Sequence, residues 1–158
     1  MKKNVAVLMG GYSSEYNISL KSGEVVYNTL LKEDDINLFK VIISKNEWKC
    51  VDSKDSLLEI KKDSFQFIRN NNLINVDLVF NTVHGIPGEN GEIQSYFENL
   101  NIKQTSSESS ESKLTFDKDR CKNDVKKIGY LIPNSILVKK EEDINTDNIL
   151  NKLTLPLF

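Results

Sequence analysis

The chain has 158 residues, of which 39% are hydrophobic and 28% charged, values that are ordinary for a globular protein. This length suits one domain, or one domain and the beginning of another. The 21 basic and 23 acidic residues leave a formal net charge of −2, which gives no electrostatic case for a nucleic-acid or anionic-membrane partner.

The cysteines and the start of the chain favour a cytoplasmic protein. Cys50 and Cys121 lie far apart and form neither a CxxC pair nor a disulfide framework, which suits a reducing compartment. The apolar stretch Val5–Met9 is too short for a signal peptide. Nothing approaches the roughly 20 apolar residues of a membrane span, so no membrane partner is expected.

The first forty-odd residues predict a β–α–β unit. Val5–Met9 is a continuous apolar run ended by two glycines, typical of a parallel strand buried on both faces. Apolar residues from Ile18 to Leu30 recur at helical spacing. Leu38–Ser44 predicts a second strand, and Glu47–Val51 a short third one.

Further elements are expected as far as residue 105. The polar residues 52–75 are interpreted as a surface connection. Asp77–Val83 predicts the next buried strand, followed by a glycine-rich loop and a helix through Phe97. Ile102–Thr105 predicts another short strand. The fold class is therefore α/β, with a small parallel sheet from about residue 4 to 105.

The last third predicts helices and one isolated strand. Thr115–Ile128 is interpreted as a single helix with Gly129 as its C-cap. Ser135–Lys139 predicts a strand, and Asp147–Leu153 a short helix capped by Thr146. The final residues 155–158 are typical of the entry to a strand.

The turn Gly10–Glu15 is the first candidate binding motif. Its two glycines allow the backbone to leave the strand sharply and bring N–H groups near a ligand. Ser13 and Ser14 are placed to cap the next helix, and Glu15 to bind a cationic amine. On the local pattern alone, an ordinary βα turn with a solvated glutamate is the more common explanation. Neither GxxxxGK[ST] nor GxGxxG occurs in the chain.

The segment His84–Gly91 is the second candidate. It follows a buried strand, at the edge where open parallel sheets bind ligands, and it holds three glycines and a proline in eight residues. His84 is the only histidine and is suited to hydrogen-bonding a carboxylate. The alternative is a loop histidine satisfied by backbone, with Glu89 as a helix-start acid. One histidine without clustered partners is no metal-ligand set.

Lys118 is the third candidate. It stands at an expected helix start between Asp117 and Asp119, from which an ammonium group can reach nucleotide phosphates. A lysine between two aspartates is more often solvated and loosely paired.

Taken in series, these motifs resemble the D-alanine–D-alanine ligases of the ATP-grasp superfamily, and the resemblance covers essentially the whole chain. The matching residues are Val7–Glu15, Ile18–Gly23, Phe80–Gly85, Gly88–Gly91, Gln94 and Thr115–Lys118. The resemblance implies a parallel-sheet, Rossmann-like pre-ATP-grasp domain over residues 1–108 and the truncated start of an ATP-grasp domain over 109–158. It also implies an enzyme that joins two D-alanines with ATP, releasing ADP and phosphate, in peptidoglycan synthesis.

The same resemblance implies the roles of the site residues. Glu15 lies by the ammonium of the first D-alanine, and His84 helps to hold that substrate and its developing charge. Both are therefore expected to be catalytic. Lys118 contacts the phosphates of ATP. The other expected substrate-binding residues are Gly10, Gly11, Ser14 and Gly85.

Similar ligases continue after a stretch like Pro156–Phe158 with a loop over ATP and with carboxylates that hold Mg²⁺. Those parts are missing from these 158 residues, so we expect no ligase activity from this chain alone. Such ligases also pair through their N-terminal domain, which predicts a homodimer. The alternatives are a non-catalytic amino-acid-binding or dimerisation module, and a ligase that joins D-alanine to another D-residue or hydroxy acid.

Overall fold

The computed structural model of the protein describes residues 2–139 and 144–157, and their contacts divide the chain into two units. The first unit extends to Phe116 and the second begins at Asp117. The predicted domain boundary after residue 108 stays a prediction. The elements of the first unit are β1 (Lys3–Gly10), α1 (Tyr16–Leu30), β2 (Ile36–Ile43), β3 (Trp48–Asp52), β4 (Leu57–Lys61), β5 (Gln66–Arg69), β6 (Asn72–Ile74), β7 (Leu78–Asn81), α2 (Glu92–Asn99), β8 (Lys103–Gln104) and α3 (Ser109–Phe116).

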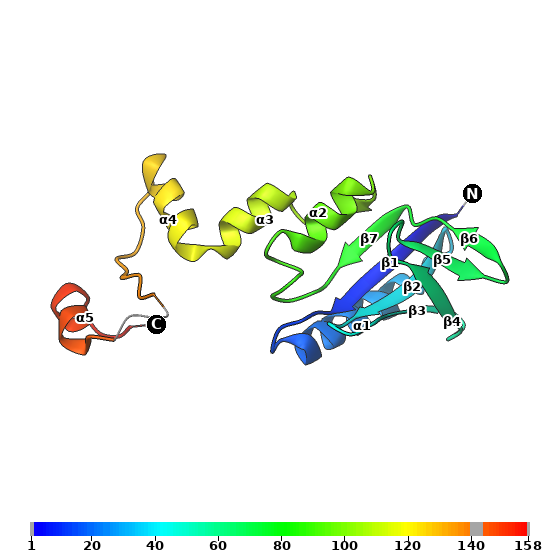
Figure 1. Cartoon of the computed structure of the whole chain (residues 1–158), viewed down its shortest axis with the longest axis horizontal. Helices are drawn as coiled ribbons and strands as arrows, with labels where there is room; N and C mark the ends of the chain where they lie inside the picture. Colours follow the sequence, from blue (N-terminus) through cyan, green and yellow to red (C-terminus); the bar gives the residue numbers. More distant parts are fainter. Residues whose placement is uncertain (1, 140–143, 158) are drawn as a thin grey trace. The chain divides into compact units, whose positions relative to one another are not determined.

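The first unit is built on one eight-stranded sheet with the order β6-β5-β4-β3-β2-β1-β7-β8. Strands β2, β1 and β7 are parallel to one another, as predicted (Figure 1). The short β8 continues this parallel half of the sheet beside β7. Strands β3 to β6 add to β2 as antiparallel neighbours. The α/β class is confirmed, whereas the sheet is mixed rather than purely parallel.

The antiparallel half corrects the interpretation of residues 52–75 as a surface connection, because β4, β5 and β6 lie in this segment. Phe65 and Phe67 are fully buried and anchor the segment in the core. Asn70 and Asn71 have positive φ angles of 50° and 62° and form the two-residue turn between β5 and β6. Turns of this kind match the twist of a hairpin and favour asparagine.

The core lies on both faces of β1, because alternate residues of a strand point to opposite sides. Val5, Val7 and Met9 pack with α1 residues such as Tyr27 and Val26 in one hydrophobic cluster. Ala6 and Leu8 belong to the other cluster, with members of α2 and of the antiparallel strands. The five residues Val5–Met9 are at most 5% exposed, which explains why the strand is an unbroken apolar run.

An aromatic cluster joins the antiparallel strands to α2. Phe65 lies at its centre, with ring centroids 4.9 Å from Phe97, 5.4 Å from Phe67 and 6.1 Å from both Trp48 and Tyr96. These contacts are edge-to-face, the arrangement that the charge distribution of aromatic rings favours. Burial, with a smaller contribution from the charge of Asp63, raises the pKa of the Tyr96 hydroxyl to about 12.

Asp52 stabilises the turn between β3 and β4. Its buried carboxylate accepts hydrogen bonds from the backbone N–H groups of Lys54 and Ser56, each at 2.9 Å, and pairs with Arg69 of β5. Burial alone would raise the pKa of Asp52. The hydrogen bonds from Ser56 and Lys54 and the charge of Arg69 outweigh it and hold the pKa below its usual range.

The second unit contains α4 (Lys118–Lys127) and α5 (Thr146–Lys152). The predicted single helix 115–128 is wrong, because α3 ends at Phe116 and Asp117 becomes the N-cap of α4. Asn145, not Thr146, caps α5. Residues 135–139 form no strand. Of the predicted strand entry at 155–158, residue 158 lies outside the described residues, and 155–157 form no strand.

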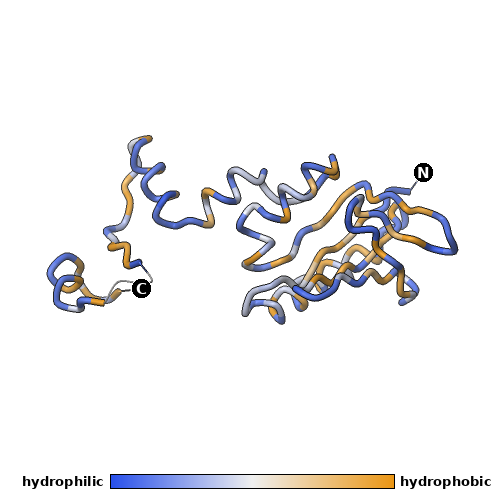
Figure 2. Tube along the Cα trace, in the orientation of Figure 1, coloured by the Kyte–Doolittle hydropathy of each residue, from blue (hydrophilic) through white to orange (hydrophobic). Residues whose placement is uncertain are grey.

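The two units differ in how they bury apolar side chains. Figure 2 shows long hydrophobic stretches along the central strands of the first unit, whereas α4 is hydrophilic. Neither α4 nor α5 has a buried residue, and Leu131 between them is fully exposed. The described part of the second unit therefore has no core of its own. Across the described residues, no helix is long and apolar enough to cross a lipid bilayer.

Candidate functional site

Two predicted binding segments meet at the carboxyl edge of the parallel strands. Strands β1 and β7 are parallel neighbours, with Val5 opposite Leu78 and Leu8 opposite Asn81, so they end at the same edge. The turn Gly10–Glu15 follows β1, and Thr82–Gly91 follows β7. Open parallel sheets bind ligands at this edge, where loops from adjacent strands face one another.

Gly10 and Gly11 let the chain turn out of β1 while it stays in close contact with β2 and with the loop after β7. Their φ angles are +96° and +116°, a region that other residues rarely adopt. A Cβ atom on Gly10 would lie 2.3 Å from the carbonyl oxygen of Ile43 at the end of β2. A Cβ atom on Gly11 would lie 2.8 Å from the Val83 side chain in the loop after β7. A larger residue at position 10 would therefore collide with the end of β2, and one at position 11 would collide with the loop after β7.

A buried serine hydroxyl joins the ends of β1 and β7. Ser19 of α1 is 0% exposed, and its Oγ accepts a hydrogen bond of 2.9 Å from the N–H of Gly10. The same hydroxyl donates to the carbonyl oxygen of Thr82 at 2.8 Å. Sequence reasoning gave Ser19 no role, although its position in the first turn of the helix after a Gly-Gly exit was a usable signal. Helix α1 thus fixes the distance between the two binding loops.

Ser13 and Ser22 hold His84 from two directions. The Ser13 hydroxyl donates to the His84 carbonyl oxygen at 3.1 Å and accepts from the N–H of Glu15 at 3.2 Å. The Ser22 hydroxyl lies 3.1 Å from Nε2 of the half-buried His84 ring. The expected capping of α1 by Ser13 or Ser14 is not found, since Glu15 is the N-cap and no side chain caps the helix. Ser13 instead braces the turn before it.

The carboxylate of Glu15 lies beside the histidine loop. Gly85, directly after His84, has a φ of +66°, and a Cβ atom there would lie 3.1 Å from Oε2 of Glu15 and 2.7 Å from Oγ of Ser13. Glu15 is exposed, so its charge is accessible to a ligand. The structure therefore brings together Gly10, Gly11, Glu15, His84 and Gly85. Ser14 is exposed next to Glu15 in the turn.

Asn81 and Gln94 brace the loop after β7. Asn81 Oδ1 accepts from the N–H of Val83 at 3.0 Å, and Asn81 Nδ2 donates to the Gly88 carbonyl oxygen at 3.1 Å. The buried Gln94 of α2 donates to the same oxygen at 2.6 Å. Glu89 closes the turn by accepting from the N–H of Gly85 at 3.1 Å. The loop is thus held by side chains from β7, from α2 and from the loop itself.

Lys118 belongs to the second unit, where it is the first residue of α4 and is exposed. The carboxylate of Asp117 accepts from the N–H of Arg120 at 3.0 Å, which starts the helix. Metal coordination has no support in the described part of the chain, because no three His, Cys, Asp or Glu side chains gather there in a way that would hold an ion.

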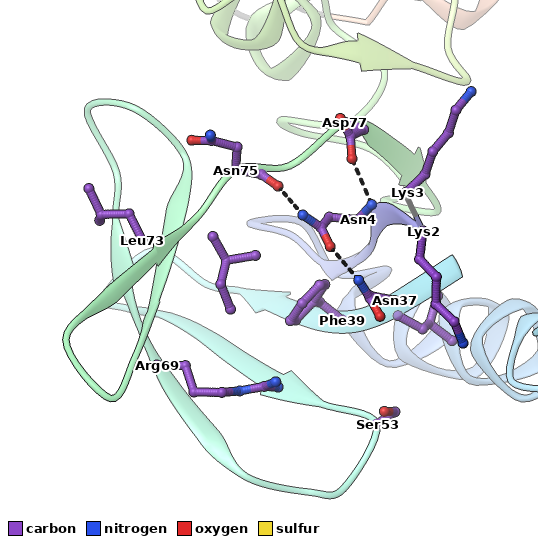
Figure 3. A pocket seen from close by; sticks show the side chains of 12 residues that line it. Lys2, Lys3, Asn4, Asn37, Phe39, Ser53, Arg69, Leu73, Asn75 and Asp77 are labelled. Carbon is purple, nitrogen blue, oxygen red and sulfur yellow. Dashed lines mark hydrogen bonds between the residues drawn. The ribbon is translucent and has the colours of Figure 1, made fainter. Parts of the chain in front are cut away.

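A hollow of about 660 Å³ lies at the opposite, amino edge of the sheet, around Asn4, Asn37 and Asp77 (Figure 3). Three of its polar residues are hydrogen-bonded to one another: Asp77 accepts from the N–H of Asn4 at 2.7 Å, and Asn4 accepts from Asn37 at 2.9 Å. Arg69 points toward the middle of the hollow but is paired with Asp52. These pairings make this hollow a weaker candidate than the carboxyl edge.

Two solved ligase structures resemble this chain. The chain superposes on VanG D-Ala:D-Ser ligase from Enterococcus faecalis with a TM-score of 0.71 and 28% identity, covering 85% of this chain and 44% of that one. The D-alanine–D-alanine ligase from Bacillus anthracis complexed with ATP gives a TM-score of 0.66 and 26% identity, covering 96% of this chain and 43% of that one. The fold is thus shared with a part of each of these ligases.

Sequence comparison identifies the family more narrowly. The D-alanine–D-alanine ligase of Christiangramia forsetii is 42% identical over 158 residues, which is all of this chain and 48% of that protein. The family model described as "D-ala D-ala ligase N-terminus" matches residues 4–107. The chain belongs to this family. It spans about half the length of the curated relatives that it matches.

Proposed function

We propose that the first unit forms the D-alanine-binding wall of a D-alanine–D-alanine ligase. The observation that carries the proposal is the position of the Glu15 carboxylate beside Gly85, in contact with the loop that holds His84. A carboxylate and an imidazole on adjoining loops match the two ends of an amino acid. Family membership supports the reaction, in which ATP activates one D-alanine for attack by the amine of a second.

In this proposal each polar group of the first D-alanine has a partner of matching chemistry. Glu15 accepts hydrogen bonds from the ammonium group, and charge-assisted bonds of this kind are among the stronger ones in proteins. His84 donates to the carboxylate and to the negative charge that develops on it during the reaction. The glycines at positions 10, 11 and 85 keep side chains away from the bound substrate. Ser14 adds a hydroxyl at the open end of the turn.

ATP is the proposed co-substrate, with Lys118 as a contact to its phosphates. The solved complex of a related ligase with ATP supports this part. Mg²⁺ would neutralise charge on the phosphates, but the described residues offer it no ligand set. The 158 residues alone are therefore proposed to lack ligase activity. A cytoplasmic role in peptidoglycan precursor synthesis is part of the same proposal, and the two free cysteines are consistent with it.

The assembly state is a further part of the proposal. A homodimer through the first unit follows from the family resemblance. Sedimentation of the purified chain as a monomer at all accessible concentrations would contradict it.

D-alanine binding tests the proposal directly. We expect ¹⁵N-labelled chain titrated with D-alanine in the millimolar range to show amide shift changes in Gly10–Glu15 and at Gly85, with smaller changes for L-alanine. Glu15→Gln should weaken D-alanine binding about tenfold or more, because a hydrogen bond to a charged group contributes about 1.5–3 kcal/mol. Glu33→Gln, an exposed change beyond the far end of α1, is the matched control.

Two results would contradict the proposal. One is the absence of shift changes at the carboxyl edge when D-alanine is added. The other is equal affinity in the Glu15→Gln variant and the unaltered chain.

A further inference from the structure

The imidazole of His84 is held by a single side chain. Its Nε2 lies 3.1 Å from the hydroxyl oxygen of Ser22, which belongs to the second turn of α1. Within residues 2–139 and 144–157, this is the only hydrogen bond of the Ser22 hydroxyl and the only one of the His84 ring. The opposite ring nitrogen, Nδ1, therefore stays available.

Ser22 lies on a part of α1 that is fixed against the sheet. Three residues earlier, Ser19 bonds to the ends of both β1 and β7. The next residue is Gly23, where a Cβ atom would lie 2.6 Å from Cβ of Met9, so helix and strand are in close contact there. The Ser22 hydroxyl is thus presented from a rigid support, whereas His84 lies in a loop.

This geometry determines which histidine nitrogen can serve a ligand. A neutral imidazole carries one N–H and one bare nitrogen, and the partner of one nitrogen selects which form is present. A hydroxyl that engages Nε2 also fixes the ring plane. We propose that Ser22 is a positioning residue that holds His84 in one tautomer and one orientation, with Nδ1 reserved for the carboxylate of the bound amino acid. This inference rests on the proposed function.

Because His84 is the only histidine in the chain, its ring nitrogens can be observed without ambiguity. The experiment is ¹⁵N NMR of the imidazole at about pH 8.5, where an ordinary histidine is neutral. We expect two well-separated nitrogen resonances in the unaltered chain, from one N–H and one bare nitrogen. In Ser22→Ala the chemical-shift difference between the two ring nitrogens should move toward the value measured for the same variant unfolded in urea, where the tautomers interconvert freely.

Two variants separate this effect from a general loosening of α1. Ser22→Thr keeps the hydroxyl and should retain the two resonances. Thr29→Ala removes a different α1 hydroxyl, which bonds only to the carbonyl oxygen of Val25, and should leave the His84 signals unchanged. Alanine is favourable within a helix, so Ser22→Ala should fold, as its amide spectrum will verify. Unchanged imidazole resonances in folded Ser22→Ala would overturn the proposal.

The D-alanine titration supplies the second readout. Ser22→Ala should weaken D-alanine binding roughly three- to tenfold, as expected for one lost hydrogen bond, and Ser22→Thr should restore it. Equal affinity in Ser22→Ala and the unaltered chain would overturn the positioning role even if D-alanine binds. Failure of D-alanine to bind the unaltered chain would instead refute the proposed function, while the imidazole spectra would still decide whether Ser22 fixes the ring.

Discussion

Replacing Ser19 with alanine removes the hydroxyl that joins the two binding loops. The change deletes an acceptor for the N–H of Gly10 and a donor for the carbonyl oxygen of Thr82, at 2.9 Å and 2.8 Å. Ser19 is 0% exposed, and Gly10 is also buried, so solvent cannot reach this N–H group without movement of α1. The variant therefore leaves a buried backbone donor without its acceptor.

The loss in the free energy of unfolding can be worked out for the Gly10 N–H and the Thr82 carbonyl separately. A buried donor left without its partner costs about 1–3 kcal/mol. The Thr82 carbonyl is half-buried, and losing its hydrogen bond costs about 0.5–1.5 kcal/mol. Together they predict a loss of about 2–4 kcal/mol in the free energy of unfolding, a large share of the roughly 5–15 kcal/mol typical of a domain.

Urea unfolding followed by circular dichroism measures this loss. With a slope of about 2 kcal/mol/M, the midpoint of Ser19→Ala should fall by about 1–2 M with no change in slope. Thr29→Ala on the exposed side of α1 is the matched control and should change the free energy by less than about 0.5 kcal/mol. A midpoint for Ser19→Ala within error of the control would refute the reasoning.

Three further predictions concern acid stability, the loop after β7 and the cysteines. Folding lowers the pKa of Asp52, so its contribution to stability should be complete above the usual pKa of 3.8 and should be lost as the pH falls below it. In Asp52→Asn, the free energy of unfolding measured with urea should no longer show this part of the pH dependence. Gly88→Ala should cost about 3 kcal/mol or prevent folding, since its Cβ would lie 2.1 Å from the carbonyl oxygen of Val83. Iodoacetamide should modify Cys121 in the folded chain and Cys50 only after unfolding, because burial raises the pKa of the Cys50 thiol to about 12.

Each of these predictions has its own control. Asp34→Asn, in an exposed turn, should leave the acid profile unchanged. Gly129→Ala also places a side chain at a positive φ, but no atom lies near the new Cβ, so a cost of only about 1 kcal/mol is expected. Equal modification rates for Cys50 and Cys121 under native conditions, measured by mass spectrometry, would show that burial does not protect the first thiol.

The parallel half of the sheet could be predicted because its sequence signal is strong. A strand with both faces buried needs apolar residues at every position, and Val5–Met9 meets that condition. The binding loops were predictable because the glycines at positions 10, 11 and 85 have positive φ angles that few other residues adopt. The contacts of Ser19 to Thr82 and of Ser22 to His84 could not be predicted, since they depend on a loop more than sixty residues away.

The antiparallel half was missed for a physical reason. Its strands are short, and their polar residues face solvent, so residues 52–75 have the composition of a connection. The signals were the alternation of Phe65 and Phe67 and the turn at Asn70–Asn71, which contains no glycine. In the second unit, Ser135–Lys139 has strand-forming residues but no partner strand, and an unpaired strand gains no ladder of hydrogen bonds. Asp117 stops one helix and caps the next, which apolar spacing alone does not reveal.

The aromatic cluster gives the first unit an intrinsic fluorescence probe. Trp48 is the only tryptophan in the chain, and its Nε1 donates a hydrogen bond of 3.2 Å to the hydroxyl of Tyr12, inside the turn that follows β1. On its other side, the Trp48 ring lies 5.5 Å from the ring of Tyr96 on α2. Any rearrangement of that turn changes the hydrogen bond of the indole. Its emission therefore reports the state of the binding loop without a label, in a chain where no second tryptophan can obscure the signal.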